Sequence, residues 1–235
     1  MNTKNLAITF TLVFASLWTT LAHAGERPNI LWIVIDDMSA NFGCYGETTI
    51  ETPEVDQLAS EGVLFTRAYA TSSVCSTFRS AMITGMYPQN TGVPTNNHEL
   101  RDDVPTLAQI AGENGYRTAF VGKWHLGGVG KPEWSPKIDG GFQHKTFMFN
   151  RGHWKKFGHD EDGPAVGAKG KGGNPSYDVA QADQTSFSTD FLTDRTIEFI
   201  RQTNDNDAPF LAVLSYPDPH GPNTVRSPYD QMFDH

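Results

Sequence analysis

The chain has 235 residues, of which 38% are hydrophobic, 11% aromatic and 19% charged, and its formal net charge is −9. This composition excludes a disordered or collagen-like chain, and the acidic balance is the opposite of the basic surplus expected in a nucleic-acid-binding protein. The length allows one α/β domain or two small domains. An anionic substrate would have to be attracted by a local group of cations rather than by the net charge.

The first 24 residues predict a secretory signal peptide. Lys4 supplies a positive start, residues 6–21 are largely apolar, and residues 22–24 (Ala-His-Ala) have the small-x-small pattern of a cleavage site. The apolar run is short for a membrane span, which takes about 20 apolar residues, and an uncleaved anchor is the alternative. We therefore expect residues 25–235 to be secreted or periplasmic, without stable membrane insertion.

The next part of the chain predicts strands alternating with helices. Residues 29–35 form a continuous β-branched and aromatic run, which is typical of a strand buried on both faces. Cap and breaker residues then predict a helix from Pro53 to Gly62 with Thr52 as N-cap, followed by a short strand over 63–68. A helix over 75–84 closed by Gly85, a helix over 105–114 and a strand over 116–121 come next.

Residues 127–186 are rich in glycine, lysine, aspartate and proline, which predicts a long insertion with a few short elements such as 147–150. An amphipathic helix over 189–201, capped by Ser188, and a buried strand over 210–216 follow. The alternation predicts the fold class α/β, with a mostly parallel sheet sandwiched by helices. Ligands of such sheets bind beyond the carboxyl ends of the strands.

Polar residues follow three of the predicted strands. Asp36 and Asp37 follow the first strand, and two carboxylates suit a hard cation such as Ca²⁺, although a solvated turn is the alternative. Lys123 and His125 are two residues apart just beyond the strand over 116–121, so they can face the same side. His220 lies between prolines that stiffen its backbone. Solvated loops remain the alternative for the last three residues.

Cys75 and Arg79 lie four residues apart on a predicted helix and therefore share one face. Cys75 would begin the helix, where free N–H groups favour anions and lower the pKa of a thiol. Arg79 could bind a tetrahedral oxyanion. A buried structural cysteine with a surface arginine is the alternative, and in an oxidising compartment a Cys44–Cys75 disulfide is another.

The chain resembles the sulfatase family of the alkaline-phosphatase superfamily from the end of the predicted signal peptide onward. The segments that carry the resemblance occur in the family's order: PNILWIVIDDM, GCYG, TPEVDQLASEGVLFTRAYA, CSTFRSAMITGMYP, GYRTAFVGKWHLG, STDFLTDRTIEFI and PFLAVLSYPDPHGPN. The resemblance implies an alkaline-phosphatase-like fold and the hydrolysis of sulfate esters. It also implies that residues 25–235 are the N-terminal portion of the catalytic domain.

The resemblance assigns a role to each matched residue. Asp36 and Asp37 would bind Ca²⁺. Cys75 would be converted by a maturation enzyme to Cα-formylglycine, whose hydrate is the nucleophile and also touches the metal; this argues against a disulfide at Cys75. Arg79 would stabilise the hydrate, and Lys123 and His125 would orient it and take its proton. His220 would bind sulfate and protonate the leaving alcohol. Lys123 would also contact the substrate.

The sequence departs from the family pattern in two respects. Thr77 stands where the family has proline or alanine, a position that the maturation enzymes read, so we expect Thr77 to lower the conversion of Cys75. The family also supplies an Asp-Asn pair, a lysine and a smaller C-terminal domain beyond the match to His220, and residues 221–235 do not contain them. Asp205-Asn206 is not that pair because it precedes the strand over 210–216. Without later strands, the sheet would expose an unpaired edge.

Three functions are consistent with these observations. The first is a sulfatase acting on a sulfated small molecule or carbohydrate. The second is a phosphodiester or phosphonate monoester hydrolase of the same superfamily. The third is a non-catalytic remnant that binds a sulfated glycan weakly or has no function of its own.

Overall fold

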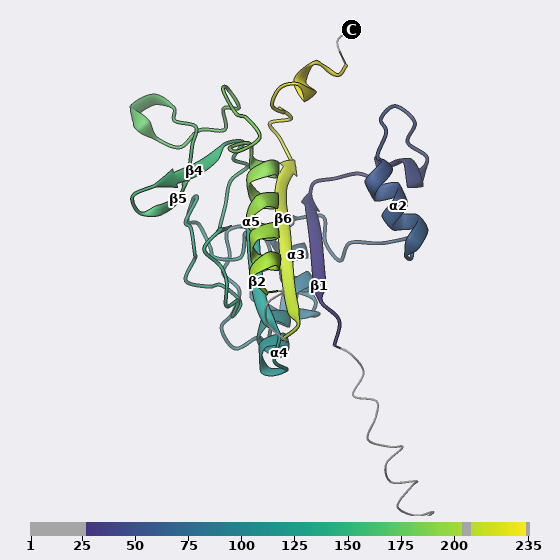
Figure 1. Cartoon of the computed structure of the whole chain (residues 1–235). Coiled ribbons are helices and arrows are strands. Elements are labelled where there is room, and N and C mark those ends of the chain that lie inside the picture. Colours follow the sequence, from purple (N-terminus) through teal and green to yellow (C-terminus); the bar gives the residue numbers. More distant parts are fainter. Residues whose placement is uncertain (1–26, 204–207, 234–235) are drawn as a thin grey trace, which may run out of the picture.

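The computed structural model describes residues 27–203 and 208–233. Its centre is a parallel four-stranded sheet with the order β1-β6-β2-β3 (Figure 1). The strands are β1 (Ile30–Asp36), β6 (Phe210–Pro219), β2 (Arg117–Lys123) and β3 (Met148–Phe149). The predicted α/β class is therefore confirmed. The expected burial of the strand over 29–35 on both faces is wrong, because β1 is an edge strand with Leu31 and Ile33 43% and 47% exposed. The predicted signal peptide and Asp205-Asn206 lie outside the described residues.

Helices cover both faces of this sheet. Helix α5 (Ser188–Thr203) lies over β6 and β2 on one face, and α3 (Cys75–Thr84) and α4 (Leu107–Glu113) lie on the other (Figure 1). Helix α2 (Pro53–Glu61) stands apart from the sheet on the side of β1 and has no buried residue. Among the described helices, none combines the length and the apolar character that a bilayer span requires.

Two cores form because successive residues of a strand point to opposite faces. Phe120 of β2 packs with Ile83 of α3, whereas the next residue, Val121, packs with Leu192 of α5. All four side chains are nearly or fully buried, at 0–5% exposure. The sheet and the two helical layers thus hold the strand ends in fixed relative positions.

The predicted helices are all present, with small shifts at their ends. Thr106 caps α4 through a capping box with Gln109, a signal that the sequence carries. Thr52 precedes α2, but its hydroxyl accepts from the N–H of Gly43 at 2.8 Å instead of capping the helix. Helix α3 closes at Gly85, which has a left-handed φ of 67°.

The predicted strand over 63–68 is wrong. These residues form no strand, and the side chains of Val63 and Phe65 are 79% and 68% exposed. A strand needs a neighbour to satisfy its backbone hydrogen bonds, and the pairing partner of β1 among the described strands is β6. Apolar periodicity alone could not reveal that this segment lacks a partner.

The insertion carries the antiparallel pair β4 (Phe157–Asp160) and β5 (Gly163–Val166), as well as the edge strand β3. Phe149 and Phe157 pack under α5, so the insertion extends the core on that face. Residues 150–156 lead from β3 to β4, and His153 and Lys155 in this segment contact Lys123 of β2 and Asp218 of β6.

We expect the Gly122→Ala variant to be destabilised by about 3 kcal/mol or more. Gly122 has a φ of +106°, and a Cβ there would lie 1.9 Å from the carbonyl oxygen of Ser215 in the paired strand β6. Gly158→Ala is the matched control, because a Cβ at Gly158 meets nothing within 4 Å. Urea unfolding of both variants checks this, and equal midpoints for the two would contradict it.

Candidate active site

The carboxyl ends of β1, β2 and β6 meet at one edge of the sheet because these strands are parallel. Asp36 ends β1, Lys123 ends β2, and His220 directly follows β6. Helix α3 brings Arg79 to the same place. The structure thus gathers four of the residues that the sequence singled out, from segments far apart in the chain.

Asp36 is the centre of the cluster. Its side chain is 7% exposed and pairs through Oδ1 with Arg79 Nη2 at 3.1 Å and through Oδ2 with Lys123 Nζ at 2.5 Å. Burial alone would raise the pKa of Asp36, but the two adjacent cations outweigh it and hold this pKa at about 2. Asp36 is therefore ionised, and both of its partners are buried with it.

Arg79 is held by more than this ion pair. Its Nη1 donates to the carbonyl oxygen of Lys123 at 2.6 Å and to Ser215 Oγ at 2.8 Å, and Ser215 Oγ in turn donates to the same carbonyl at 2.8 Å. Arg79 thereby ties α3 to the ends of β1, β2 and β6. Ser215 was not predicted as a site residue because a serine inside an apolar strand gives no such signal.

Cys75 opens onto a cavity of about 360 Å³ beside this cluster. Asp36, Asp37 and Arg79 line the same cavity. Asp37 is exposed and has a left-handed φ of 62°, which turns the chain sharply at the end of β1. The two aspartates therefore differ, since one is buried among cations and the other is open to solvent.

The first turn of α3 is held by hydrogen bonds from neighbouring loops. The backbone N–H of Ser76 donates to Asn96 Oδ1 at 3.1 Å, and Thr77 Oγ1 donates to the carbonyl oxygen of Val74 at 2.6 Å and lies 2.6 Å from Ser72 Oγ. Thr77 is 3% exposed.

The predicted lowering of the Cys75 pKa is wrong. Burial, followed by the negative charge of Asp36, raises the pKa of the thiol. The nearby cations Lys123 and Arg79 lower this pKa but do not outweigh these two effects. Cys75 and Cys44 are both free thiols in the structure.

His125 lies two residues beyond β2, in a left-handed conformation with a φ of 62°. It is 8% exposed, and its Nδ1 is buried without a hydrogen-bond partner. Burial and then the charge of Lys123 lower the pKa of His125 to about 3, so the ring is neutral. The charges of Lys123, Arg79 and Asp36 all act on the pKa of His125, so His125 lies near the cluster. In the structure it forms no hydrogen bond with any of these three residues.

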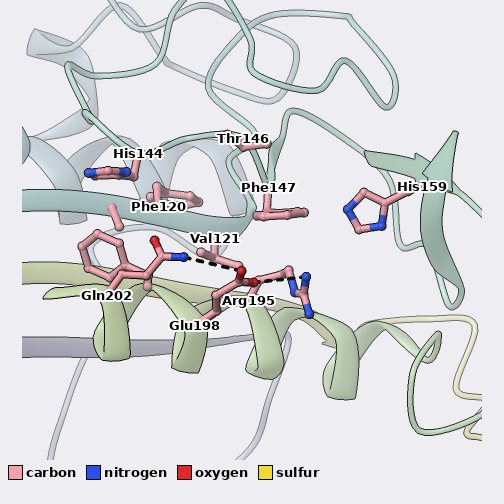
Figure 2. Close-up of a pocket in the computed structure, with 11 residues that line it drawn as sticks. Phe120, Val121, His144, Thr146, Phe147, His159, Arg195, Glu198 and Gln202 are labelled. Carbon is pink, nitrogen blue, oxygen red and sulfur yellow. Dashed lines mark hydrogen bonds and ion pairs between the residues drawn. The ribbon is translucent and has the colours of Figure 1, made fainter. Parts of the chain in front are cut away.

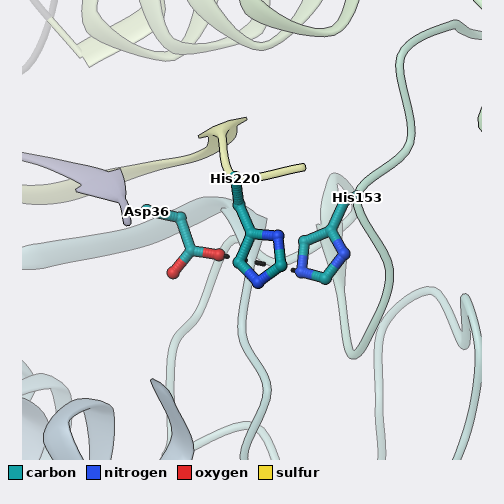
Figure 3. A group of neighbouring side chains, drawn as sticks. All are labelled: Asp36, His153 and His220. Carbon is teal, nitrogen blue, oxygen red and sulfur yellow. Dashed lines mark ion pairs between the residues drawn. The ribbon is translucent and has the colours of Figure 1, made fainter. Parts of the chain in front are cut away.

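His153 joins the site from the insertion and was missed by the sequence reasoning. Its Nε2 lies 2.8 Å from Lys123 Nζ, and its ring stacks on that of His220 at 3.5 Å and 7° (Figure 3). Burial and then Lys123 lower the pKa of His153 to about 3. Lys123 was identified because it follows a strand of the parallel sheet, and His153 follows β3 in the same way. Treating 147–150 as a strand of the main sheet would therefore have revealed His153.

A buried ion pair supports the His220 loop. Lys155, 1% exposed, pairs with Asp218 and donates to the carbonyl oxygen of His220 at 3.2 Å. Asp218 also accepts from Ser188 Oγ at 2.6 Å at the start of α5. Ser188, predicted as a helix cap, therefore ties α5 to the end of β6.

The described residues fit a calcium ion by donor type. Ca²⁺ binds oxygen, and the carboxylates of Asp36 and Asp37 border the same cavity. A set of Asp36, His153 and His220 also has ligand atoms within 4.8 Å of one another, but its two imidazoles suit zinc better than calcium. Lys123 Nζ contacts both Asp36 and His153, and Arg79 contacts the other carboxylate oxygen of Asp36. Any metal bound through Asp36, calcium included, would have to displace or share these cationic contacts.

A second cavity, also of about 360 Å³, lies on the α5 face and shares none of its lining residues with the first (Figure 2). Arg195 pairs there with Glu198 at 3.1 Å and lies over the rings of Phe147 and Phe191. His144 lines the same cavity. None of the residues that the sequence predicted for the site lies in this second cavity.

Comparison with known proteins relates the chain to sulfatases. It is 30% identical over 212 residues to the uncharacterized sulfatase YidJ of Escherichia coli K12, covering 88% of this chain and 41% of that protein. It is 46% identical over 108 residues to an N-acetylgalactosamine-6-O-sulfatase of Bacteroides thetaiotaomicron, covering 43% of this chain and 21% of that protein.

Solved structures agree with this relationship. The yidJ protein of Bacteroides fragilis superposes with a TM-score of 0.67 at 26% identity, covering 85% of this chain and 46% of that one. A phosphonate monoester hydrolase of Agrobacterium radiobacter superposes with a TM-score of 0.62 at 29% identity, covering 88% of this chain and 44% of that one. The chain spans less than half the length of each of these relatives. The family model for sulfatases matches residues 28–235, and the chain therefore belongs to the sulfatase family.

Proposed function

We propose that the chain carries the nucleophile side of a sulfuric ester hydrolase site, which converts R–O–SO₃⁻ and water to R–OH and HSO₄⁻. The observation that carries this proposal is the buried cluster of Asp36, Arg79 and Lys123 beside Cys75, in a chain of the sulfatase family. Fixed cations at the site, with Arg79 lining the cavity itself, favour an anionic ester whose charge moves to the leaving oxygen.

Each residue has a distinct task in this proposal. The nucleophile is Cα-formylglycine derived from Cys75. Lys123 and His125 are the pair that handles the hydrate: the Lys123 ammonium orients it and the neutral His125 accepts its proton. His220 binds the sulfate and donates a proton to the leaving alcohol. Arg79 stabilises the hydrated nucleophile from the next turn of α3. The raised pKa of Cys75 supports the need for modification, since an unmodified thiol would be mostly protonated at neutral pH.

Asp36 and Asp37 would hold Ca²⁺ in this proposal. The ion would withdraw charge from the sulfate oxygens when bound. Two carboxylates are fewer than the six to eight oxygen ligands that calcium takes, so other groups would complete the shell. In the family these come from beyond the match to His220.

Replacing Thr77 should change the maturation of Cys75. Thr77 stands where the family has proline or alanine, and a proline is tolerated in the first turn of a helix because its missing N–H has no intrahelical partner. We expect Thr77→Pro and Thr77→Ala, co-expressed with a formylglycine-generating enzyme, to raise the converted fraction at position 75 severalfold. Peptide mass spectrometry measures that fraction. An unchanged fraction in both variants would refute a limiting role for Thr77.

A sulfated carbohydrate is the substrate class that we favour. A relative that is 46% identical over 108 residues is named an N-acetylgalactosamine-6-O-sulfatase. We further propose that residues 1–24 direct export and that residues 25–235 are the N-terminal portion of a longer catalytic domain. Export fits a substrate found outside the cytoplasm.

Phosphonate monoester hydrolysis is the second candidate, favoured by the likeness to the Agrobacterium radiobacter enzyme. Rates on a sulfate ester and a phosphonate monoester of the same phenol separate the two. Faster sulfate cleavage supports the sulfatase, and faster phosphonate cleavage supports the alternative. A protein with confirmed formylglycine that cleaves neither ester would support the non-catalytic remnant.

A further inference from the structure

His153 is presented to the site by a tight turn. Gly152 has a φ of 116°, and a Cβ there would lie 2.3 Å from the Trp154 indole. The indole Nε1 donates to the carbonyl oxygen of Arg151 at 2.9 Å, and Trp154 is 4% exposed. The backbone on both sides of His153 is thus fixed by packing, so its ring has a defined direction.

The imidazole of His153 makes two contacts with residues of the proposed machinery. Lys123 Nζ has only protons to give, so the 2.8 Å contact requires a lone pair on His153 Nε2 and places the ring proton on Nδ1. The second contact of the His153 ring is its parallel stack on the His220 ring, with the ring centroids 3.5 Å apart. One ring therefore touches both Lys123 and His220, and Figure 3 shows its stack on His220.

A lysine side chain is costly to fix because it has many rotamers. Asp36 Oδ2 supplies one anchor for the Lys123 ammonium, and His153 Nε2 supplies a second from a different segment. His220 is restrained at its backbone by Lys155, and its ring Nδ1 lies 3.2 Å from the carbonyl oxygen of Gly221. The stack on His153 restrains the plane of the ring as well.

We propose that His153 is a positioning residue of the site, which holds the Lys123 ammonium through Nε2 and the plane of the His220 ring by stacking. The proposal rests on the function proposed above, because it gives the two held groups their task. A positioning role predicts a loss in turnover that is larger than the loss in substrate affinity, since misplaced groups weaken the transition state most.

Three variants divide the two contacts. His153→Gln keeps an acceptor near Nε2 and loses the ring, His153→Phe keeps a ring and loses the acceptor, and His153→Ala loses both. We expect His153→Ala to lower kcat by about 10- to 100-fold with KM changed less than about threefold, and each of the other two to recover part of kcat. His144→Ala, in the second cavity, is the control and should retain wild-type kinetics.

The proposal is overturned if kcat of His153→Ala stays within about twofold of wild type, or if KM alone changes. It is also overturned if all three variants lose kcat equally and in proportion to their loss of stability in urea, because that would be a structural effect. Partial recovery by Gln and Phe supports it.

If the wild-type protein carries formylglycine at position 75 but has no turnover, the proposed function is rejected. The role of His153 is then tested by a second measurement. Nitrogen-15 NMR of the imidazoles needs no catalysis. We expect His153 to be protonated at Nδ1, with an Nε2 signal that shifts in Lys123→Met. A proton on Nε2, or no shift in Lys123→Met, would overturn the proposal on its own.

Discussion

Cys75→Ala is expected to lower kcat/KM on an aryl sulfate by about 10³- to 10⁶-fold, the range seen when a covalent nucleophile is removed. Cys75 is half-buried at the start of α3 and borders the cavity next to Asp36 and Arg79. Alanine fits the same position in the helix, so the fold should persist. Steady-state kinetics at a fixed calcium concentration measure the loss.

Cys44→Ala is the matched control for this experiment. Cys44 lies in the 3-10 turn Gly43–Tyr45, where its backbone N–H donates to Asp56 Oδ1 at 2.6 Å, a bond that alanine preserves. Its turnover should equal that of the wild type. Equal turnover of wild type and Cys75→Ala would show that Cys75 is not the nucleophile.

Asp36→Asn is expected to destabilise the protein by about 3–5 kcal/mol, the cost of removing one partner from a buried charge cluster. The substitution leaves Arg79 and Lys123 buried at 2% and 0% exposure without a compensating anion. Unfolding in urea, followed by tryptophan fluorescence, measures the change. Asp37→Asn is the control, because Asp37 is exposed, and we expect it to change stability by less than about 0.5 kcal/mol.

A second variant shows whether the effect of Asp36→Asn is electrostatic. Adding Lys123→Met to Asp36→Asn removes one of the cations left without an anion, so the double variant should be less destabilised than the sum of the single variants.

The stability of the protein in acid gives an independent check. The pKa of Asp36 is about 2 in the folded protein and 3.8 without the protein environment, so its contribution is complete above about pH 5 and is lost as pH falls through about 2. Additive effects, or an unchanged acid transition in Asp36→Asn, would contradict this account.

Much of the site followed from one rule applied to the sequence. Apolar runs located β1, β2 and β6, and the rule that ligands gather beyond the carboxyl ends of parallel strands pointed to Asp36, Lys123 and His220. The i, i+4 spacing put Cys75 and Arg79 on one face of a helix. The structure agrees with the placement of these residues because placement depends on local periodicity and on a shared strand direction.

The remaining features depend on contacts between distant segments. His153 lies in an insertion whose two-residue strand β3 is too short for a clear periodic signal. Ser215 looks like any residue of an apolar strand until Arg79 is placed against it. The pKa of Cys75 is governed by burial and by Asp36, and neither can be judged from the position of a cysteine at a helix start.

The most direct test compares turnover with the state of residue 75 in preparations of the same protein. Samples expressed with and without a formylglycine-generating enzyme would be assayed on an aryl sulfate, and the converted fraction measured by mass spectrometry. We predict that kcat per molecule rises in proportion to that fraction and extrapolates to zero for unmodified Cys75. Undiminished turnover by fully unmodified protein, or none by fully converted protein, would contradict the proposed site.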